Sequence, residues 1–243
     1  MVNKHIPREP RKSTDNAREA YSRTVARRSY QQFCSMATAL DVIGERWTLL
    51  IVRELMLGPQ RFKDLLDGLP GIGRNLLSAR LKHLEAEGLV ARRRLPPPAA
   101  SAVYELTEEG GSLGPVMSEL GRWGAERLGP REPGQHFRAG WAMFPLSYMA
   151  DREAAQGLDE VYEFRVDEET FHLRVRDGDV QPRAGSAGRA EMVAKMDTAT
   201  LADLLAQTLT PVQAIAQGRV SIDGSPEALQ HALALWPEEP AEP

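Results

Sequence analysis

The first half of the chain is a series of short amphipathic segments separated by glycine and proline. Apolar residues at helical spacing predict helices at residues 36–43, 45–57 and 62–67. Gly58-Pro59 follows the second of these segments and ends it. Short helices joined by tight turns in this order predict the beginning of a helix-turn-helix unit.

The next segment, GIGRNLLSARLKHLEAEG, predicts a helix with two different faces. Leu77, Leu81 and Leu84 recur at i, i+4 and i+7, so one side of this helix has to face a core. Arg74 and Asn75 fall mainly on the other side. The glycine at the end of the segment stops the helix.

A two-stranded ribbon is predicted after this helix. Residues 89–95 and 102–106 form its strands, and residues 96–100, three prolines and two alanines, form its tip. A last helix runs from residue 107 to about 128, with acidic residues in its first turn. Helix, helix, turn, amphipathic helix and basic ribbon is the order of a winged helix-turn-helix domain.

The second half has a different pattern. A helix is expected at residues 145–156, and VYEFRV and FHLRVR then alternate apolar and polar residues, which predicts a hairpin. Another strand is expected at residues 192–196, and RVSIDG reads as a short strand between helices. Three amphipathic helices are predicted in LADLLAQTL, PVQAIAQG and SPEALQHALALW. Strands first and helices last indicate a sheet with helices on one face.

A length of 243 residues is enough for two ordinary domains, each with its own core. We therefore expect an α+β protein with five parts. These are a basic flexible arm (1–28), a winged-helix DNA-binding and dimerisation domain (29–129), a linker (130–140), an effector domain with a mixed sheet (141–238) and a tail (239–243).

The net charge also differs between the two halves of the chain, which meet near residue 130. Residues 1–130 hold 20 Lys and Arg against 15 Asp and Glu, a net charge of +5, whereas residues 131–243 hold 10 against 19, a net of −9. The first half is thus suited to a polyanion, although an ordinary solvated surface would have similar charge.

We expect a cytoplasmic protein with no membrane partner. No stretch approaches the ~20 apolar residues of a membrane helix, and the N-terminus lacks the apolar core of a secretory signal. The single cysteine, Cys34, cannot form an intramolecular disulfide, which agrees with a reducing compartment.

Arg74 and Asn75, at the front of the amphipathic helix, are suited to reading bases in the major groove. Arginine pairs with the guanine edge and asparagine with the adenine edge. Arginines of the ribbon can contact phosphates or enter a minor groove. The predicted contacts to double-stranded DNA are Arg74, Asn75, Ser78, Arg80, Lys82, Arg92, Arg93 and Arg94. Each alone is typical of a solvated surface, so the combination carries the prediction.

Extended motifs resemble the HxlR-type winged-helix transcriptional regulators of bacteria and archaea. They are ALDVIGERWTLLIVREL, GPQRFKDLL, LPGIGRNLLSARLKHLEAEGLVARR and YELTEEG, within residues 34–128. The resemblance implies a homodimer, built from the N-terminal helix and the helix after the wing. It also implies a roughly palindromic operator whose half-sites lie ~34 Å apart.

Cys34 is the candidate redox residue. HxlR-type regulators often carry a cysteine near this position, and in some of them it senses electrophiles or oxidants. Here Ser35 stands where the family usually has proline. A structural or incidental cysteine is the alternative, since free cysteines are frequently buried and inert.

The second half resembles sterol carrier protein type 2-like domains over residues 161–236, most clearly in AIAQGRVSIDG. The resemblance implies an apolar cavity that accepts a lipid-like or other hydrophobic small molecule. The candidate lining residues are Trp141, Phe144, Tyr162, Phe164, Phe171, Leu173, Met192, Met196, Leu205 and Ile215. A filled core built from the same residues is the alternative.

Catalytic and metal chemistry are not expected. The five histidines show no ligand spacing, and residues 131–243 show no catalytic constellation, so we predict no metal, no cofactor and no enzyme activity. The sequence predicts a homodimeric DNA-binding regulator modulated by an apolar small molecule. The alternatives are a cavity-free dimerisation or partner module in the second half, or a lipid carrier or enzyme.

Overall fold

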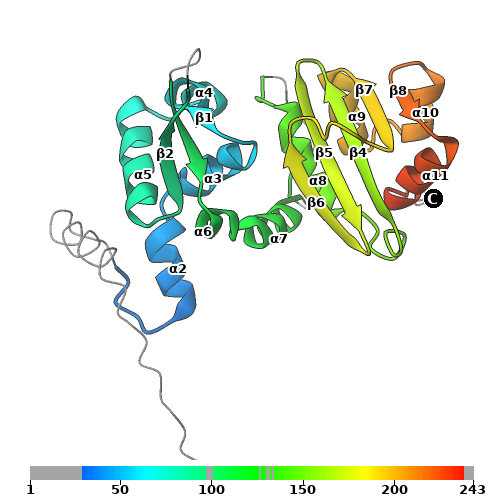
Figure 1. Ribbon diagram of the computed structural model, residues 1–243. Helices are drawn as coiled ribbons and strands as arrows, with labels where there is room; N and C mark the ends of the chain where they lie inside the picture. Colours follow the sequence, from blue (N-terminus) through cyan, green and yellow to red (C-terminus); the bar gives the residue numbers. More distant parts are fainter. Residues whose placement is uncertain (1–28, 97–100, 126, 130–131, 133, 238–243) are drawn as a thin grey trace, which may run out of the picture. The chain divides into compact units, whose positions relative to one another are not determined.

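The computed structural model describes residues 29–96, 101–125, 127–129, 132 and 134–237 (Figure 1). The predicted arm at 1–28, most of the wing tip, part of the linker and the tail at 239–243 lie outside the described residues. The chain forms two compact units. One comprises residues 1–52 and 60–111, and the other residues 53–59 and 112–243.

The first unit combines short helices with a three-stranded antiparallel sheet of order β1-β3-β2. Its elements are α2 (Ser35–Ile43), the first part of α3 (Thr48–Met56), β1 (Gln60–Arg61), α4 (Phe62–Gly68), α5 (Arg74–Ala86), β2 (Val90–Arg94), β3 (Ala102–Leu106) and α6 (Glu108–Gly111). The predicted winged helix-turn-helix is confirmed. Strand β1 was not predicted, because two residues are too few to show an alternating pattern.

The predicted apolar stripe of α5 is buried in the core of the first unit. The core residues of this unit that are at most 3% exposed are Ile51, Val52, Leu65, Leu69, Leu77, Leu81, Leu84, Val90 and Val103. Burial of one leucine side chain contributes about 1.5–3 kcal/mol. The three leucines of α5 therefore fix which side of the helix remains outside.

The second unit is a five-stranded mixed sheet with helices (Figure 1). Besides residues 53–59 it contains α7 (Gly114–Ala125), the 3-10 helix η1 (Ala139–Ala142), α8 (Met143–Tyr148), β4 (Asp159–Val166), β5 (Glu169–Arg176), β6 (Asp179–Ala184), β7 (Met192–Met196), α9 (Thr198–Leu205), α10 (Pro211–Ala216), β8 (Ser221–Gly224) and α11 (Pro226–Leu235). The predicted α+β class is confirmed.

The sheet has the order β6-β5-β4-β7-β8, with β4 and β7 parallel and the other pairs antiparallel. The predicted hairpin is β4 and β5, in which Tyr162 pairs with Leu173 and Phe164 with Phe171. These four side chains lie on the face that packs against the helices. Edge strand β6 was not predicted. Pro182 interrupts its pattern, and an edge is where a sheet tolerates proline.

Two predicted helices differ from the observed ones. The helix expected at 145–156 begins earlier, after η1, and α8 ends at Tyr148. The helix expected at 107–128 is divided into α6 and α7, in a stretch where three glycines between residues 110 and 114 weaken a continuous helix. Helix α7 groups with the second unit because it packs closely on α8. A Cβ placed on Gly121 would lie 3.1 Å from the Tyr148 ring.

Candidate nucleic-acid interface and apolar core

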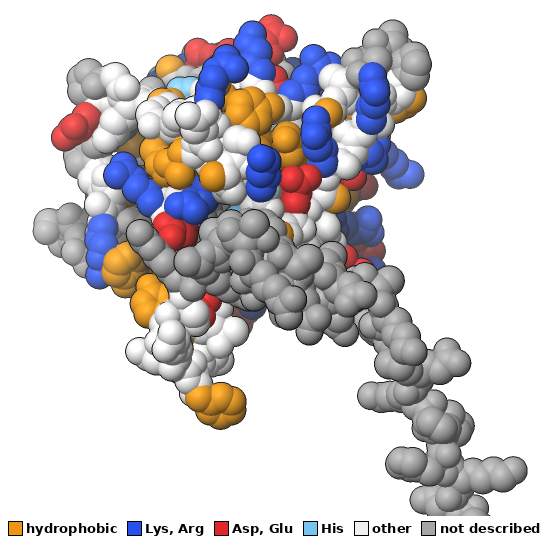
Figure 2. Space-filling view, turned by 90° about the vertical axis from the view of Figure 1, so that its left-hand side faces the viewer, with side chains coloured by type: hydrophobic (Ala, Val, Ile, Leu, Met, Phe, Trp, Pro, Cys, Tyr) orange, Lys and Arg blue, Asp and Glu red, His pale blue; other side chains and the backbone are white. Residues whose placement is uncertain are grey.

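Helix α5 presents a polar edge opposite its buried leucines. Arg74, Asn75 and Lys82 are exposed, and Ser78 is half-buried beside them. Ala79 is also exposed and occupies the centre of this edge, one turn after Asn75. We call these five residues the α5 edge. Figure 2 shows Lys and Arg side chains on the side of the first unit that faces the viewer.

The turn before α5 sets where this edge begins. Gly73 is the N-cap and provides no side-chain cap, so the first amide groups of the helix stay open to an anion. Gly71 has a left-handed φ of +93°, and the ring of Trp47 lies against it, 3.6 Å from where a Cβ would be. Trp47 itself has a φ of +78°, which is unusual for a bulky residue. Trp47 thus supports the turn that starts α5.

Two polar contacts hold the second half of α5, through Arg80 and His83. His83 Nε2 lies 2.9 Å from the Val42 carbonyl oxygen, and Arg80 Nη2 donates to Glu45 Oε2 over 2.8 Å. Arg80 is therefore already paired with a carboxylate, and a DNA phosphate would have to compete with Glu45 for its guanidinium. Glu45 could not be predicted as the partner of Arg80, since it lies 35 residues away with no local pattern to connect them.

The wing exposes Arg92, Arg93 and Arg94 on β2. Arg93 forms a bidentate pair with Glu105 on β3, with Nε–Oε1 and Nη2–Oε2 distances of 2.9 Å. These hydrogen bonds lower the pKa of the Glu105 carboxyl and raise the pKa of Arg93. The guanidinium of Arg92 lies 5.9 Å from the Tyr104 ring centroid. The strand register could have identified Glu105 as the partner of Arg93. Glu105 pairs with Ala91, which lies on the same face of β2 as Arg93.

Cys34 is exposed and free, and it directly precedes α2. Its carbonyl oxygen accepts from the amide and the hydroxyl of Thr38, at 2.9 Å and 3.1 Å. Its backbone thus starts the helix while its thiol remains accessible. A redox role for Cys34 remains a prediction.

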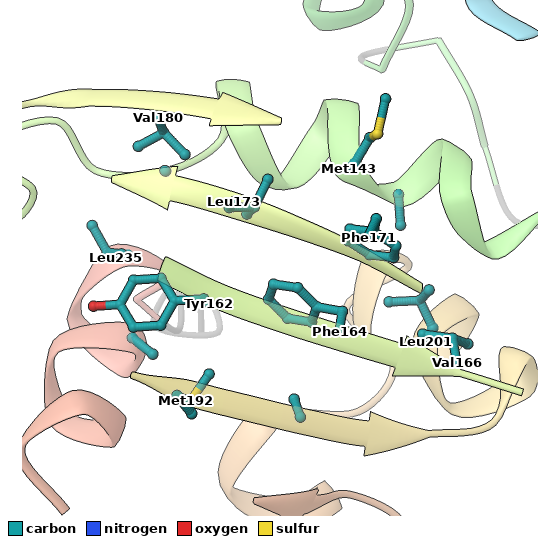
Figure 3. Close-up of a cluster of buried hydrophobic side chains, with 14 of the residues drawn as sticks. Met143, Tyr162, Phe164, Val166, Phe171, Leu173, Val180, Met192, Leu201 and Leu235 are labelled. Carbon is teal, nitrogen blue, oxygen red and sulfur yellow. The ribbon is translucent and has the colours of Figure 1, made fainter. Parts of the chain in front are cut away.

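Most candidate pocket residues gather in one apolar cluster of the second unit (Figure 3). Tyr162, Phe164, Phe171, Leu173 and Met192 are buried, and the partly buried members packed against them are Phe144, Met196, Leu205 and Ile215. The Phe164 and Phe171 rings are stacked with centroids 5.1 Å apart, and Trp236 meets Phe164 edge-on at 6.1 Å. Trp236 was not among the predicted lining residues, although it ends an amphipathic helix segment.

One end of the cluster is polar. The hydroxyl of Tyr162 donates to Glu160, whose other oxygen lies 2.7 Å from His231 Nδ1 on α11. Burial, followed by the bond to Glu160, raises the pKa of the Tyr162 phenol. The buried phenol thus has a partner, as a buried polar group requires.

Trp141 lies apart from this cluster. Its indole Nε1 donates to Glu54 over 2.9 Å, and the Arg53 guanidinium stacks 3.7 Å from its ring centroid. The structure therefore gives Trp141 a polar environment, different from the apolar lining predicted for it. The reason is Glu54, a buried carboxylate that the hydrophobic pattern of α3 does not reveal.

Among the described residues, no group of three or more His, Cys, Asp or Glu side chains is arranged to hold a metal ion. In the same part of the chain, every helix is too short or too polar to cross a bilayer.

Comparison with known proteins finds a different family for each half of the chain. Residues 42–132 match the model of the HxlR-like helix-turn-helix family, and residues 144–235 match that of the SCP-2 sterol transfer family. The chain is 39% identical over 92 residues to the HTH-type transcriptional regulator YvaP of Bacillus subtilis, covering 38% of this chain and 85% of YvaP. It is 40% identical over 88 residues to YodB of the same organism, covering 36% of this chain and 79% of YodB.

Among solved structures, the reduced form of the B. subtilis transcriptional regulator YodB is similar. It is 35% identical in sequence, with a TM-score of 0.36, and the match covers 42% of this chain and all of YodB. The sequence matches, which include most of YvaP and YodB, establish the family. This chain belongs to the HxlR-like helix-turn-helix family of transcriptional regulators, and residues 144–235 of its second half match the SCP-2 sterol transfer family.

Proposed function

We propose that the protein is a homodimeric, sequence-specific DNA-binding regulator whose second unit responds to an apolar small molecule. The observation that carries the DNA proposal is the α5 edge, four of whose five residues are exposed, together with a helix start that has no side-chain cap. We infer a cytoplasmic location, since the DNA target is there.

Each exposed group of the interface has a suitable DNA partner. Arg74 matches O6 and N7 of guanine, and Asn75 matches N6 and N7 of adenine. Ala79, between them and Lys82, is small enough to let the helix backbone approach the bases. On the wing, Arg92 and Arg94 can neutralise phosphates without giving up an internal ion pair to the described residues. Arg93 has to leave Glu105 first.

Dimerisation is supported by apolar side chains that each unit leaves exposed. On α7, Val116, Leu120 and Trp123 are 51%, 45% and 58% exposed at spacings of four and three residues. On and before α2, Phe33 and Met36 are 113% and 66% exposed. Continuous apolar stripes of this kind mark protein interfaces. A two-fold dimer would require a palindromic operator.

The apolar cluster of the second unit supports the effector proposal, because it supplies an aromatic and methionine-rich environment for a hydrophobic ligand. To regulate, the ligand has to bind the DNA-competent and DNA-incompetent states with different affinity. The complete burial of Tyr162 and Leu173 and the stacked Phe164 and Phe171 rings favour a second candidate, a filled core that serves only dimer or partner contacts.

Selection of genomic fragments by the purified protein tests DNA binding, and it should return a palindromic site. On that site, Arg74→Ala or Asn75→Ala should each cost ~1–3 kcal/mol of binding free energy and relax the preference at one base. Arg189→Ala is the matched control, because Arg189 is exposed in the second unit. Failure to retain any duplex at low ionic strength would contradict the proposal.

Glu105→Gln tests whether the ion pair with Glu105 keeps Arg93 from binding a phosphate. Loss of the carboxylate should free Arg93 for a phosphate and steepen the slope of log K against log salt by about 0.9. The same change in an Arg93→Gln background gives the effect of the lost charge alone, and should leave the slope unchanged. Equal effects in both backgrounds, measured by fluorescence anisotropy, would show that Arg93 does not reach the DNA.

Trp123→Ala tests the dimer. A buried tryptophan at an interface typically contributes ≥ ~2 kcal/mol, so the dimer dissociation constant should rise by at least about thirtyfold in sedimentation velocity. Met149→Ala, at a residue 48% exposed outside the α7 stripe, is the control and should leave the constant unchanged. A monomeric wild-type protein would refute this part of the proposal.

A thermal-shift screen of the full chain with fatty acids, sterols and other apolar compounds tests the effector. Compounds that raise the melting temperature should also change the affinity for the selected operator, because binding differs between the two states. The ligand proposal is wrong if every stabilising compound leaves operator affinity unchanged. If no compound stabilises the chain, the filled-core module is favoured.

A further inference from the structure

The positive charge of the first half of the chain comes from residues 1–28, which we call the basic arm. These residues hold eight Lys and Arg against three Asp and Glu, a net charge of +5, whereas residues 29–130 hold 12 against 12. The eight cations are Lys4, Arg8, Arg11, Lys12, Arg18, Arg23, Arg27 and Arg28. The basic arm lies outside the described residues. Without it, the first half brings no net charge to a polyanion.

The chain that follows the basic arm folds back along α2. The Ser29 hydroxyl donates to Asp41 Oδ2 over 2.8 Å, and the backbone amide of Tyr30 donates to Asp41 Oδ1 over 2.9 Å. Both oxygens of one carboxylate thus bind residues that lie 12 and 11 positions earlier in the chain. We call these two hydrogen bonds the Asp41 clasp.

The turn between the Asp41 clasp and α2 has an unfavourable backbone conformation. Gln31 has a φ of +51°, in the left-handed region that residues with a side chain rarely adopt. Its amide donates to Ser29 Oγ over 3.2 Å, and the amide of Cys34 donates to the Gln32 carbonyl over 2.9 Å. Such a backbone persists where surrounding contacts determine it, so the Asp41 clasp specifies this reversal of the chain.

The Asp41 clasp lies near the end of α2 that packs against α5. The carbonyl oxygen of Val42, next to Asp41, is 2.9 Å from His83 Nε2, and Glu45 pairs with Arg80 at 2.8 Å. His83 and Arg80 belong to the second half of α5. All of these contacts lie within the first unit. The chain of the basic arm therefore joins this unit beside α5.

We propose that the basic arm binds phosphates of the duplex that α5 contacts, and that the Asp41 clasp sets the point from which the arm reaches them. This inference rests on the proposed function and adds a contact to it. Lys and Arg side chains on phosphates position a protein on DNA and carry no sequence information. An extended chain of 28 residues spans at most ~100 Å, so the arm can reach beyond one helical turn of DNA, ~34 Å.

The Asp41 clasp raises the concentration of the arm's cations at the duplex. Without the clasp, the chain would join the unit at Cys34, at the other end of α2, a helix of nine residues that is ~14 Å long. The effective concentration of a tethered group depends on its tether and on the distance that the tether has to span. Asp41 is thus a positioning residue that acts through the charges of the basic arm.

The test is a double-mutant cycle in the full chain. One variant is Asp41→Ala, and the other, the neutral arm, has Gln in place of all eight cations of residues 1–28. Fluorescence anisotropy gives the affinities for the selected operator and for a scrambled duplex over a range of salt. The neutral arm should weaken binding to both duplexes by the same factor, at least about tenfold, and flatten the slope of log K against log salt by about 3 to 4.

Asp41→Ala should lower the affinity for both duplexes by about threefold to fivefold when the basic arm is present, and should have no effect with the neutral arm. Asp67→Ala is the matched control and should not lower either affinity. Asp67 is an exposed acid on α4 of the same unit, and its loss changes the net charge equally. If Asp41→Ala does not fold, Ser29→Ala removes one of the two hydrogen bonds and should act in the same direction.

The outcomes separate this inference from the proposed function. A wild-type protein that retains no duplex would reject the proposed function, and the inference with it. Operator binding that is unchanged by the neutral arm would show that the arm serves another partner, and would overturn the inference alone. Equal effects of Asp41→Ala with the basic and the neutral arm would show that Asp41 only supports α2, and would also overturn the inference alone.

Discussion

The arrangement of the first unit depends on the burial of one side of α5. Leu77, Leu81 and Leu84 are at most 1% exposed, so the helix cannot rotate without bringing leucine into water. This single constraint determines that Asn75, Ala79 and Lys82 face outward. The chemistry available to a ligand along this helix is thus a consequence of core packing.

Carboxylates then divide the cations of this interface into two groups. Glu45 engages Arg80 and Glu105 engages Arg93, whereas the α5 edge keeps Arg74 and Lys82 outside the ion pairs seen among the described residues. Exposed ion pairs of this kind are weak, about 0–1 kcal/mol each, so a phosphate can compete for either arginine. The interface therefore contains cations that can bind a phosphate directly and cations for which a phosphate has to displace a carboxylate.

Much of the fold could be predicted from the sequence, because the spacing of apolar residues along a helix or strand indicates which face is buried. The leucine stripe of α5 and the alternation in β4 and β5 both correspond to buried faces. Contacts between distant charged residues could not be predicted in this way. Glu54 lies in an apolar helix pattern as an apparent exception, and only folding brings Arg138, 84 residues later, to its carboxylate. The hydrogen bond from Trp141 to the same carboxylate could not be predicted either.

Contact between the α5 edge and the bases of a duplex can be measured by site-specific photocrosslinking. A photoreactive amino acid at position 79, in the centre of the edge, should crosslink to bases of a bound duplex. The same group at position 212, a residue 55% exposed in the second unit, should give no crosslink. Binding of the duplex with no crosslink from position 79 would contradict the account.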